Sequence, residues 1–166
     1  KAGENQLLLK VVNYRGGYAF YFRVDPRTGD VRVAADDFVK PNGLAFSPDE
    51  RTLYITDSAV TDGPDYPSHI RAFDVKADGQ LGGGDVFATT VGIPDGLRVD
   101  PLGNIWASAG PGIDCYDPTG ALLGRIEFPD DVTNLTFGGP HDARLFVTSA
   151  RSLYLVDGEA SGARWP

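Results

Sequence analysis

The sequence predicts an all-β fold, and three observations support this prediction. Short runs rich in β-branched and aromatic residues alternate with turn signals every 8–15 residues along the chain. No segment of 12 residues combines a helix cap with the apolar stripe of an amphipathic helix. The 21 Gly and 12 Pro are scattered rather than clustered, and similar turns recur in the same order.

Each expected strand is a short run of strand-forming residues between two turn signals. In chain order the expected strands span residues 7–12, 18–24, 31–35, 43–46, 52–56, 70–75, 84–88, 96–99, 104–108, 113–116, 122–128, 134–137, 144–148 and 152–156. In the turns an Asp accepts backbone N–H bonds, a Pro presets φ and a Gly takes positive φ. Nearly the same turn stands at 25–29 and 117–120, and a second matching pair stands at 47–50 and 100–103.

An internal repeat connects three parts of the sequence. Similar segments, each followed by a turn and another expected strand, lie at 41–46, 94–99 and 132–137. Leu44 and Leu97 are 53 residues apart, a spacing that includes an inserted loop at 59–67, and Leu97 and Leu135 are 38 apart. A unit of roughly 40–50 residues with four short strands is the size of a β-propeller blade. A β-sandwich is the alternative fold, but it would not predict repeated turns in a fixed order.

The repeat predicts one partial β-propeller domain over residues 1–166, with blades at about 5–37, 42–89, 95–128 and 133–157. This amounts to about three and a half four-stranded blades, whereas propellers usually close with about 4–8 blades. The last expected blade lacks its outer strand, and the chain has no Met, even at position 1. We therefore expect the chain to be part of a ring that a second polypeptide, an absent segment or a symmetry mate completes.

The charge balance excludes some classes of partner. The chain has 15 Lys and Arg against 23 Asp and Glu, so its formal net charge is −8. An acidic surface disfavours nucleic acid, whose phosphates need clustered Lys and Arg, but it attracts cations. No apolar run approaches the roughly 18–20 residues of a membrane span, so we expect no membrane segment. Cys115 alone can make neither an internal disulfide nor a zinc knuckle, and it leaves both the cytoplasm and secretion open for a soluble protein.

Five short segments resemble the SMP-30/gluconolactonase/LRE-like family. They are 41–49 (PNGLAFSPD), 53–58 (LYITDS), 93–97 (IPDGL), 103–107 (GNIWA) and 133–139 (TNLTFGG). The similarity runs in family order from about residue 21 to 156 and looks like the C-terminal half of such a protein. It implies a six-bladed ring with one divalent cation, most often Ca²⁺, in the central channel. It also implies hydrolysis of a small-molecule lactone or related ester, and a partner, the remaining propeller segment or a second chain, that completes the ring.

The resemblance assigns roles to two residues. It implies that Asn42 and Asp95 are metal ligands and that Asp95 is also the catalytic acid/base group. A further family ligand, a Glu near the start of the first blade, has no matching segment in this chain. Glu4 lies near the N-terminus but lacks the family context, so it is not assigned.

The repeat gives a physical reason for this pair of ligands. Asn42 and Asp95 stand at the same position of consecutive repeats, each directly before Gly-Leu. The innermost strands of a propeller line its channel, so we expect their starts to converge at the channel mouth. A hard cation such as Ca²⁺ prefers oxygen ligands at about 2.3–2.6 Å, and an amide carbonyl with a carboxylate meets that preference. The alternative is that both residues only form the turns before strands, where Asn and Asp are favoured.

Four further residues are weaker candidates for contacts with the substrate or the channel. Thr133 occupies the equivalent place in the third repeat, and Asn134 is adjacent to it. Asp57 and Ser58 end a strand beside the inserted loop, and a loop-capping role is the favoured alternative for both. The inserted loop at 59–67 is expected to cover the channel mouth.

Three functions compete at this stage. The first is a metal-dependent hydrolase of lactones, in which a metal-polarised carbonyl is attacked by water with Asp95 as the base. The second is a non-catalytic calcium-binding or interaction propeller, because a fold does not determine a function. The third is a related propeller with other chemistry, such as a strictosidine synthase or a phosphotriesterase-like calcium enzyme.

Overall fold

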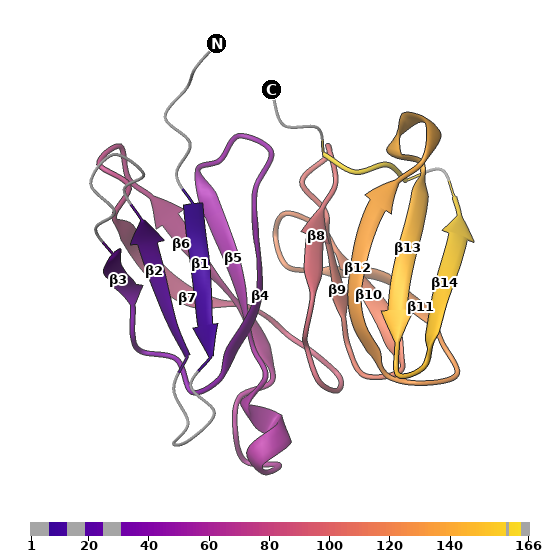
Figure 1. Ribbon diagram of the computed structural model, residues 1–166, viewed down its shortest axis with the longest axis horizontal. Helices are drawn as coiled ribbons and strands as arrows, with labels where there is room; N and C mark the ends of the chain where they lie inside the picture. The colour runs from indigo at the N-terminus through magenta and orange to yellow at the C-terminus, as the bar shows by residue number, and fades with distance from the viewer. Residues whose placement is uncertain (1–6, 13–18, 25–30, 159, 164–166) are drawn as a thin grey trace.

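The computed structural model describes residues 7–12, 19–24, 31–158 and 160–163, and these residues form four antiparallel sheets (Figure 1). The first sheet contains β1 (Leu7–Val12), β2 (Ala19–Val24) and β3 (Val31–Ala35). The second contains β4 (Pro41–Phe46), β5 (Thr52–Asp57), β6 (His69–Val75) and β7 (Leu81–Thr89). The third contains β8 (Leu97–Val99), β9 (Ile105–Ser108), β10 (Gly112–Tyr116) and β11 (Leu122–Glu127). The fourth contains β12 (Val132–Gly138), β13 (Arg144–Ser149) and β14 (Ser152–Asp157).

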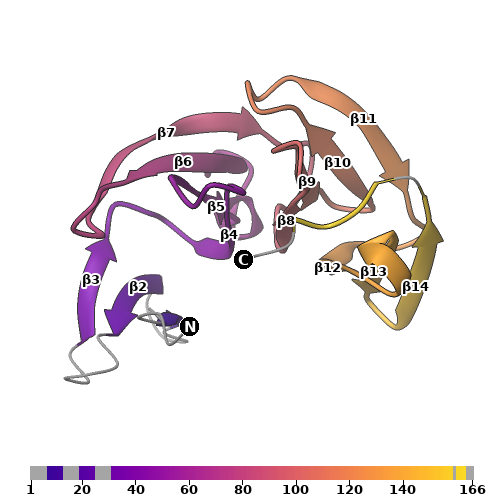
Figure 2. The ribbon, with the colours of Figure 1, turned by 90° about the horizontal axis from the view of Figure 1, so that it is seen from above.

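The four sheets stand side by side along an arc, as the view from above shows (Figure 2). Within the second, third and fourth sheets the strands follow one another in chain order, so that β4, β8 and β12 lie on the inner side of the arc. The strands β7, β11 and β14 lie on its outer side (Figure 2). This arrangement of radiating meanders confirms the prediction of an all-β partial propeller, with sheets of three, four, four and three described strands.

The largest differences from the expected strands occur at bulges. The strand β4 begins at Pro41 rather than at 43, because Pro41 still pairs with Asp57 across a shift of register. The strand β7 runs from Leu81 to Thr89 instead of 84–88, and its pairing with β6 shifts register twice. A bulge lets pairing continue past an extra residue, which a pattern of alternating residues does not reveal.

Two turn predictions are confirmed by their hydrogen bonds. The Asp100 carboxylate accepts bonds from the backbone N–H of Leu102 and Asn104, both at 2.9 Å, and Gly103 has φ of 84°. At 117–120 the Asp117 carboxylate accepts the same kind of bonds, and Gly120 has φ of 88°. The turn predicted at 25–29 and Glu4 lie outside the described residues.

Among the side chains that the structure describes, the core forms three apolar layers between neighbouring sheets. The central layer joins the second and third sheets and is made of Tyr54, Ile70, Ala88, Leu97, Val99, Ile105, Ala107 and Tyr116. A second layer, around Leu53, Ile55 and Phe73, packs against Ala34 and Ala35 of β3. A third layer, made of Ile113, Val132, Leu135, Leu145 and Val147, joins the third and fourth sheets. The sheets are thus held together by their apolar faces. In the described residues no helix is long and apolar enough to cross a membrane.

Candidate functional site

The starts of the inner strands are joined to one another by backbone hydrogen bonds. The N–H of Gly43 donates to the carbonyl of Asp95 at 3.0 Å, and the N–H of Gly96 donates to the carbonyl of Thr133 at 3.0 Å. The same bond thus links the same repeat position from the second sheet to the third and from the third to the fourth. Asn42 directly precedes Gly43, so its segment lies beside Asp95 although 53 residues separate them in sequence.

This close approach of the inner strands requires glycine. A Cβ atom added to Gly43 would lie 2.1 Å from the Asp95 carbonyl oxygen. One added to Gly96 would lie 2.3 Å from Oδ1 of Asn134 and 2.9 Å from its Cα. Neither glycine has a positive φ. Glycine is therefore needed at both positions because there is no room for a Cβ atom.

Bulges occur at two of the three equivalent positions. In β4, Asn42 and Gly43 together lie opposite one residue of β5, because Pro41 pairs with Asp57 and Leu44 with Ile55. In β12 the register shifts between Val132 and Asn134, at Thr133. Bulges turn a side chain away from the regular alternation of a strand, and they are frequent beside active sites.

Every backbone polar group of Asp95 and Gly96 has a hydrogen-bond partner. The N–H of Asp95 donates to Oγ of Ser108 at 2.8 Å, and its carbonyl accepts from Thr56 Oγ1 at 2.9 Å as well as from Gly43. The Gly96 carbonyl accepts from the N–H of Ser108 at 2.9 Å. One residue earlier, Ser58 Oγ donates to the carbonyl of Pro94. The backbone that carries the Asp95 side chain is therefore held rigidly by buried hydroxyl groups.

The hydroxyl residues were missed by the sequence-based prediction of site residues. Thr56 and Ser108 are both 0% exposed; Thr56 is the next-to-last residue of β5 and Ser108 the last of β9, the second strands of consecutive repeats. Thr148 stands at the corresponding place of β13, where its hydroxyl lies 2.9 Å from that of Thr133. A hydroxyl at the same place in three aligned repeats was a visible signal. Its meaning depends on contacts between sheets, which the alignment does not contain.

Both carboxylate oxygens of Asp57 accept hydrogen bonds from backbone N–H groups. Oδ1 accepts hydrogen bonds from the N–H groups of Lys40 and Ala59, at 2.8 and 3.2 Å, and Oδ2 accepts one from Val39 at 2.9 Å. The residue is 2% exposed. These bonds fix the segment that leads into β4 and the start of a short 3₁₀ helix at Ala59–Asp62. The geometry favours the loop-capping role that was the alternative for this residue.

The inserted loop lies at the same end of the second sheet as Asn42. Its 3₁₀ helix follows β5 directly, and Ser58 N–H donates to the Lys40 carbonyl at 2.9 Å. The Lys40 ammonium reaches back to Asp62 at 2.6 Å and to the hydroxyl of Thr61 at 2.5 Å. The loop is thereby tied to the segment that enters β4 (Figure 1).

Thr133 and Asn134 are exposed at the start of β12. The Thr133 hydroxyl lies 2.9 Å from the Thr148 hydroxyl, and Asn134 Oδ1 accepts a bond from the N–H of Leu135 at 2.9 Å. The structure places both residues beside Gly96, but their proposed contact with a substrate stays a prediction.

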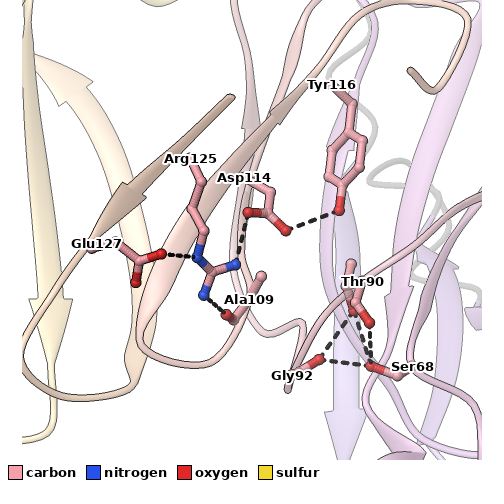
Figure 3. A network of polar contacts seen from close by, with 8 residues as sticks. All are labelled: Ser68, Thr90, Gly92, Ala109, Asp114, Tyr116, Arg125 and Glu127. Carbon is pink, nitrogen blue, oxygen red and sulfur yellow. Dashed lines mark hydrogen bonds and ion pairs between the residues drawn. The ribbon is translucent and has the colours of Figure 1, made fainter. Parts of the chain in front are cut away.

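A partly buried polar network supports the third sheet (Figure 3). The Arg125 guanidinium bonds to the carboxylate of Asp114 at 2.8 Å, to Glu127 at 2.9 Å and to the carbonyl of Ala109 at 2.7 Å. The Tyr116 hydroxyl donates to Asp114 at 3.1 Å. Burial, followed by the charge of Asp114, raises the pKa of the Tyr116 phenol far above its ordinary value. The network anchors the turn between β9 and β10.

The turn between β9 and β10 contacts the loop that carries Asp95. The N–H of Gly110 donates to the carbonyl of Ile93 at 3.2 Å. On the other side of the loop, the Ser68 hydroxyl donates to the Gly92 carbonyl at 2.6 Å and lies 3.0 Å from the Thr90 hydroxyl (Figure 3). The segment from β7 to β8 is therefore fixed at several points before it reaches Asp95.

The donor atoms at this end suit a hard cation in kind. Asn42 and Asp95 are both partly exposed and offer an amide and a carboxylate oxygen on neighbouring segments. Ca²⁺ takes about 6–8 oxygen ligands, so two side chains supply part of a coordination shell. Among the described residues there is no group of three or more His, Cys, Asp or Glu side chains that could hold a metal ion.

His69 lies close to this end of the second sheet, opposite Asp57 in the pairing of β5 with β6. Burial lowers the pKa of the His69 imidazole, while the charge of Asp57 opposes this shift and that of Arg71 adds to it. The imidazole therefore favours its neutral form near pH 7.

Comparisons with known proteins show relatives of similar sequence and fold. A lactonohydrolase of Aspergillus oryzae, oryH, is 34% identical over 148 residues, which cover 78% of this chain and 32% of that protein. The structure of a gluconolactonase from Xanthomonas campestris superposes with a TM-score of 0.74 at 35% identity, and the match covers 87% of this chain and 46% of that one. A calcium-binding protein from Agrobacterium tumefaciens, regucalcin, gives a TM-score of 0.79 at 27% identity, covering 96% and 59%.

The chain thus spans about a third of the length of the fungal relative and about half of the two solved structures. Over its own length, the model of one family matches nearly the whole chain, from residue 10 to residue 151. The matched region contains the three inner strands, the glycines that let them approach one another, and Asn42 and Asp95. The chain belongs to the SMP-30/gluconolactonase/LRE-like family.

Proposed function

We propose that the whole protein to which these residues belong hydrolyses a small-molecule lactone or a related ester. The observation that carries the proposal is the hydrogen bond from Gly43 N–H to the Asp95 carbonyl, which brings Asn42 and Asp95 to one place. The names of the fungal and Xanthomonas relatives, a lactonohydrolase and a gluconolactonase, support the same reaction class.

Asn42 and Asp95 would hold one divalent cation, for which we propose Ca²⁺. Their oxygens are the hard donors that Ca²⁺ prefers, and the Agrobacterium relative is a calcium-binding protein. Further ligands would come from parts of the protein outside these residues, as the resemblance implies. When bound, the cation supplies Lewis-acid polarisation of the ester carbonyl and neutralises the charge that develops on its oxygen.

Asp95 would also act on the attacking water. Its carboxylate would orient the water and accept its proton, while Asn42 contributes a neutral oxygen that takes no proton. The backbone N–H and carbonyl groups of Asp95 and Gly96 all have hydrogen-bond partners, so the backbone that carries the carboxylate need not be ordered when the substrate binds. Thr133 and Asn134 would contact the substrate from the next sheet, and Asp57 and Ser58 would hold the loops.

The test is a comparison of Asp95→Asn and Asn42→Ala in the whole protein, with a panel of γ- and δ-lactones and a titration of Ca²⁺. General-base catalysis contributes about 10²–10⁴-fold, so Asp95→Asn should lower kcat by at least about 100-fold at saturating Ca²⁺. Asn42→Ala should act through weaker metal binding, so excess Ca²⁺ should restore part of its activity.

Asp74→Asn is the matched control, because it removes the same charge from an exposed position on β6 at the opposite end of the sheet. It should leave kcat near that of the unmutated protein. Near-normal kcat in Asp95→Asn at saturating metal would show that Asp95 is not the base.

A non-catalytic calcium-binding role is the second candidate, and the name of the Agrobacterium relative favours it. Ca²⁺ binding and lactone hydrolysis, measured on the same protein, distinguish the two functions. A protein that binds Ca²⁺ through Asn42 and Asp95 but hydrolyses no lactone in the panel would favour the binding role.

We also propose that another propeller segment or a second chain completes the arc. The strand β14 pairs with β13 alone among the described strands, and its Leu153 and Leu155 are 69% and 48% exposed. Open strand edges and exposed apolar residues favour association. Light scattering on the 166-residue chain alone should show assemblies, whereas a compact monomeric ring would contradict this proposal.

A further inference from the structure

One buried hydroxyl group contacts the backbone of both candidate ligand segments. Thr56 Oγ1 accepts the N–H of Gly43 at 2.7 Å and lies 2.9 Å from the carbonyl oxygen of Asp95, to which it donates its proton. A longer contact of 3.3 Å joins it to the carbonyl of Gly43. Thr56 is 0% exposed, so water does not replace these contacts.

The other hydroxyl groups at this site hold one segment each. The Ser108 hydroxyl accepts the N–H of Asp95, and the Ser58 hydroxyl donates to the Pro94 carbonyl. Thr56 differs because its oxygen lies between the peptide after Asn42 and that of Asp95. A direct backbone hydrogen bond from Gly43 to Asp95 links these two segments, and Thr56 contacts both of its ends.

The side chain of Thr56 is suited to set a distance. It lies on a central strand, in a run of five buried residues from Leu53 to Asp57. A β-branched side chain has restricted χ1 freedom, and packing on a strand restricts it further. Its hydroxyl oxygen is therefore held at a fixed place between the two backbones, whereas a flexible side chain would let the spacing vary.

We propose that Thr56 is a positioning residue, which sets the spacing between Asn42 and Asp95 through the hydroxyl contacts with Gly43 and Asp95. The inference rests on the proposed function, since it gives this spacing a role in binding a cation and orienting a base. Thr56 itself would touch neither the cation nor the substrate.

The experiment compares Thr56→Val, Thr56→Ser and Thr52→Val in the whole protein. The first keeps the shape and removes the hydroxyl, the second keeps the hydroxyl, and the third makes the same change at the far end of the same strand. The measurements are the Kd for Ca²⁺ by calorimetry, kcat and KM on the lactone panel, the melting temperature, and amide hydrogen exchange of Gly43 in the metal-free protein.

In Thr56→Val we expect the Kd for Ca²⁺ and the exchange rate of Gly43 each to rise about tenfold, the size expected for the loss of one buried hydrogen bond. The value of kcat at saturating Ca²⁺ should fall by at least about tenfold, because small errors in position are costly to catalysis. Thr56→Ser keeps the hydroxyl but not the branch, so its changes should be smaller than those of Thr56→Val, and Thr52→Val should match the unmutated protein in these quantities. If Thr56→Val does not fold, the test is repeated with Thr56→Ala, which removes the same hydroxyl and puts no methyl group in its place.

The outcomes separate this inference from the proposed function. Unchanged exchange of Gly43 in a folded variant without the hydroxyl overturns the inference, whether or not the protein is an enzyme. A lower melting temperature with unchanged Kd and kcat shows a structural role alone and also overturns it. An unmutated protein that neither binds Ca²⁺ nor hydrolyses any lactone contradicts the proposed function, and with it the role of the spacing.

Discussion

Asp57 and Asp95 lie at the same end of neighbouring sheets, but Asp57 is buried whereas Asp95 is partly exposed. Asp57 is 2% exposed, and three backbone N–H groups occupy its carboxylate. At Asp95 the backbone N–H and carbonyl are occupied, while the residue is partly exposed. A carboxylate that accepts three buried N–H groups is structural, because any other contact would leave those donors unmet. Asp95 instead combines a fixed backbone with partial exposure, as the proposed ligand role requires.

Asp57→Ala should have the largest effect on stability. It leaves the N–H groups of Val39, Lys40 and Ala59 without their acceptor, and each unmet buried donor costs about 1–3 kcal/mol. Since water can reach some of them, we expect a loss of about 3 kcal/mol in the free energy of unfolding. Urea denaturation of the whole protein measures it. Asp95→Ala, the matched change, should cost far less in metal-free buffer, and equal losses would remove the distinction between the two residues.

Ca²⁺ should stabilise the protein through Asp95 and not through Asp57. A ligand at about 100 times its Kd adds about 2.7 kcal/mol to the free energy of unfolding. We therefore expect the melting temperature to be higher with Ca²⁺ than with a chelator, and the difference to vanish in Asp95→Ala. Asp57→Asn, if folded, should keep the difference. A melting temperature that does not respond to Ca²⁺ in the unmutated protein would count against the metal site.

Gly43→Ala should move the start of β4 away from the Asp95 segment, to which the Gly43 N–H is hydrogen-bonded. Its added Cβ would meet the Asp95 carbonyl oxygen at 2.1 Å, so one inner strand must move. Overpacking of this kind costs about 1–3 kcal/mol. Gly124→Ala is the control, because a Cβ there meets nothing within 4 Å. Thermal unfolding of both variants should show a loss at Gly43 alone, and a neutral Gly43→Ala would mean that the inner strands are not packed so closely.

The smallest expected effect is a pH dependence that originates beside Asp57. Burial holds the pKa of folded His69 below its unfolded value near 6.5, so the unfolded state takes up a proton first as the pH falls. Stability should therefore be unaffected above that value and should decline as the pH drops towards the lower folded pKa. The ring is partly solvated, so the decline should stay below about 1 kcal/mol. His69→Gln should reduce the slope between pH 7 and 5 in denaturation curves, and an unchanged slope would assign it to other groups.

The sequence predicted the strands because their residues and turns carry local signals. Val, Ile and aromatic residues mark each strand, and Asp, Pro and Gly mark the turns with their own hydrogen bonds and backbone angles. The aligned repeats also predicted that Asn42 and Asp95 lie at equivalent positions of neighbouring sheets. Their roles as ligands, and that of Asp95 as a base, stay predictions.

The contacts between sheets could not be predicted in the same way. Nothing local indicates that the carboxylate of Asp57 accepts three backbone bonds or that the backbone N–H and carbonyl of Asp95 bond to other sheets or strands. Likewise, the sequence around a threonine in a strand does not indicate that its hydroxyl bonds to a carbonyl 39 residues away, as that of Thr56 does. Such contacts depend on how closely two sheets approach, and that distance is set by packing around Gly43 and Gly96.

The sequence by itself determined the all-β class, the repeat and the equivalence of Asn42 and Asp95, because these follow from local preference and periodicity. The tertiary structure alone decided how these polar groups are held: the carboxylate of Asp57, the backbone of Asp95 and the hydroxyl of Thr56 between the two inner strands. The physical reason is that burial must satisfy every hydrogen-bonding group it removes from water, and the partners that do so come from strands far apart in the chain.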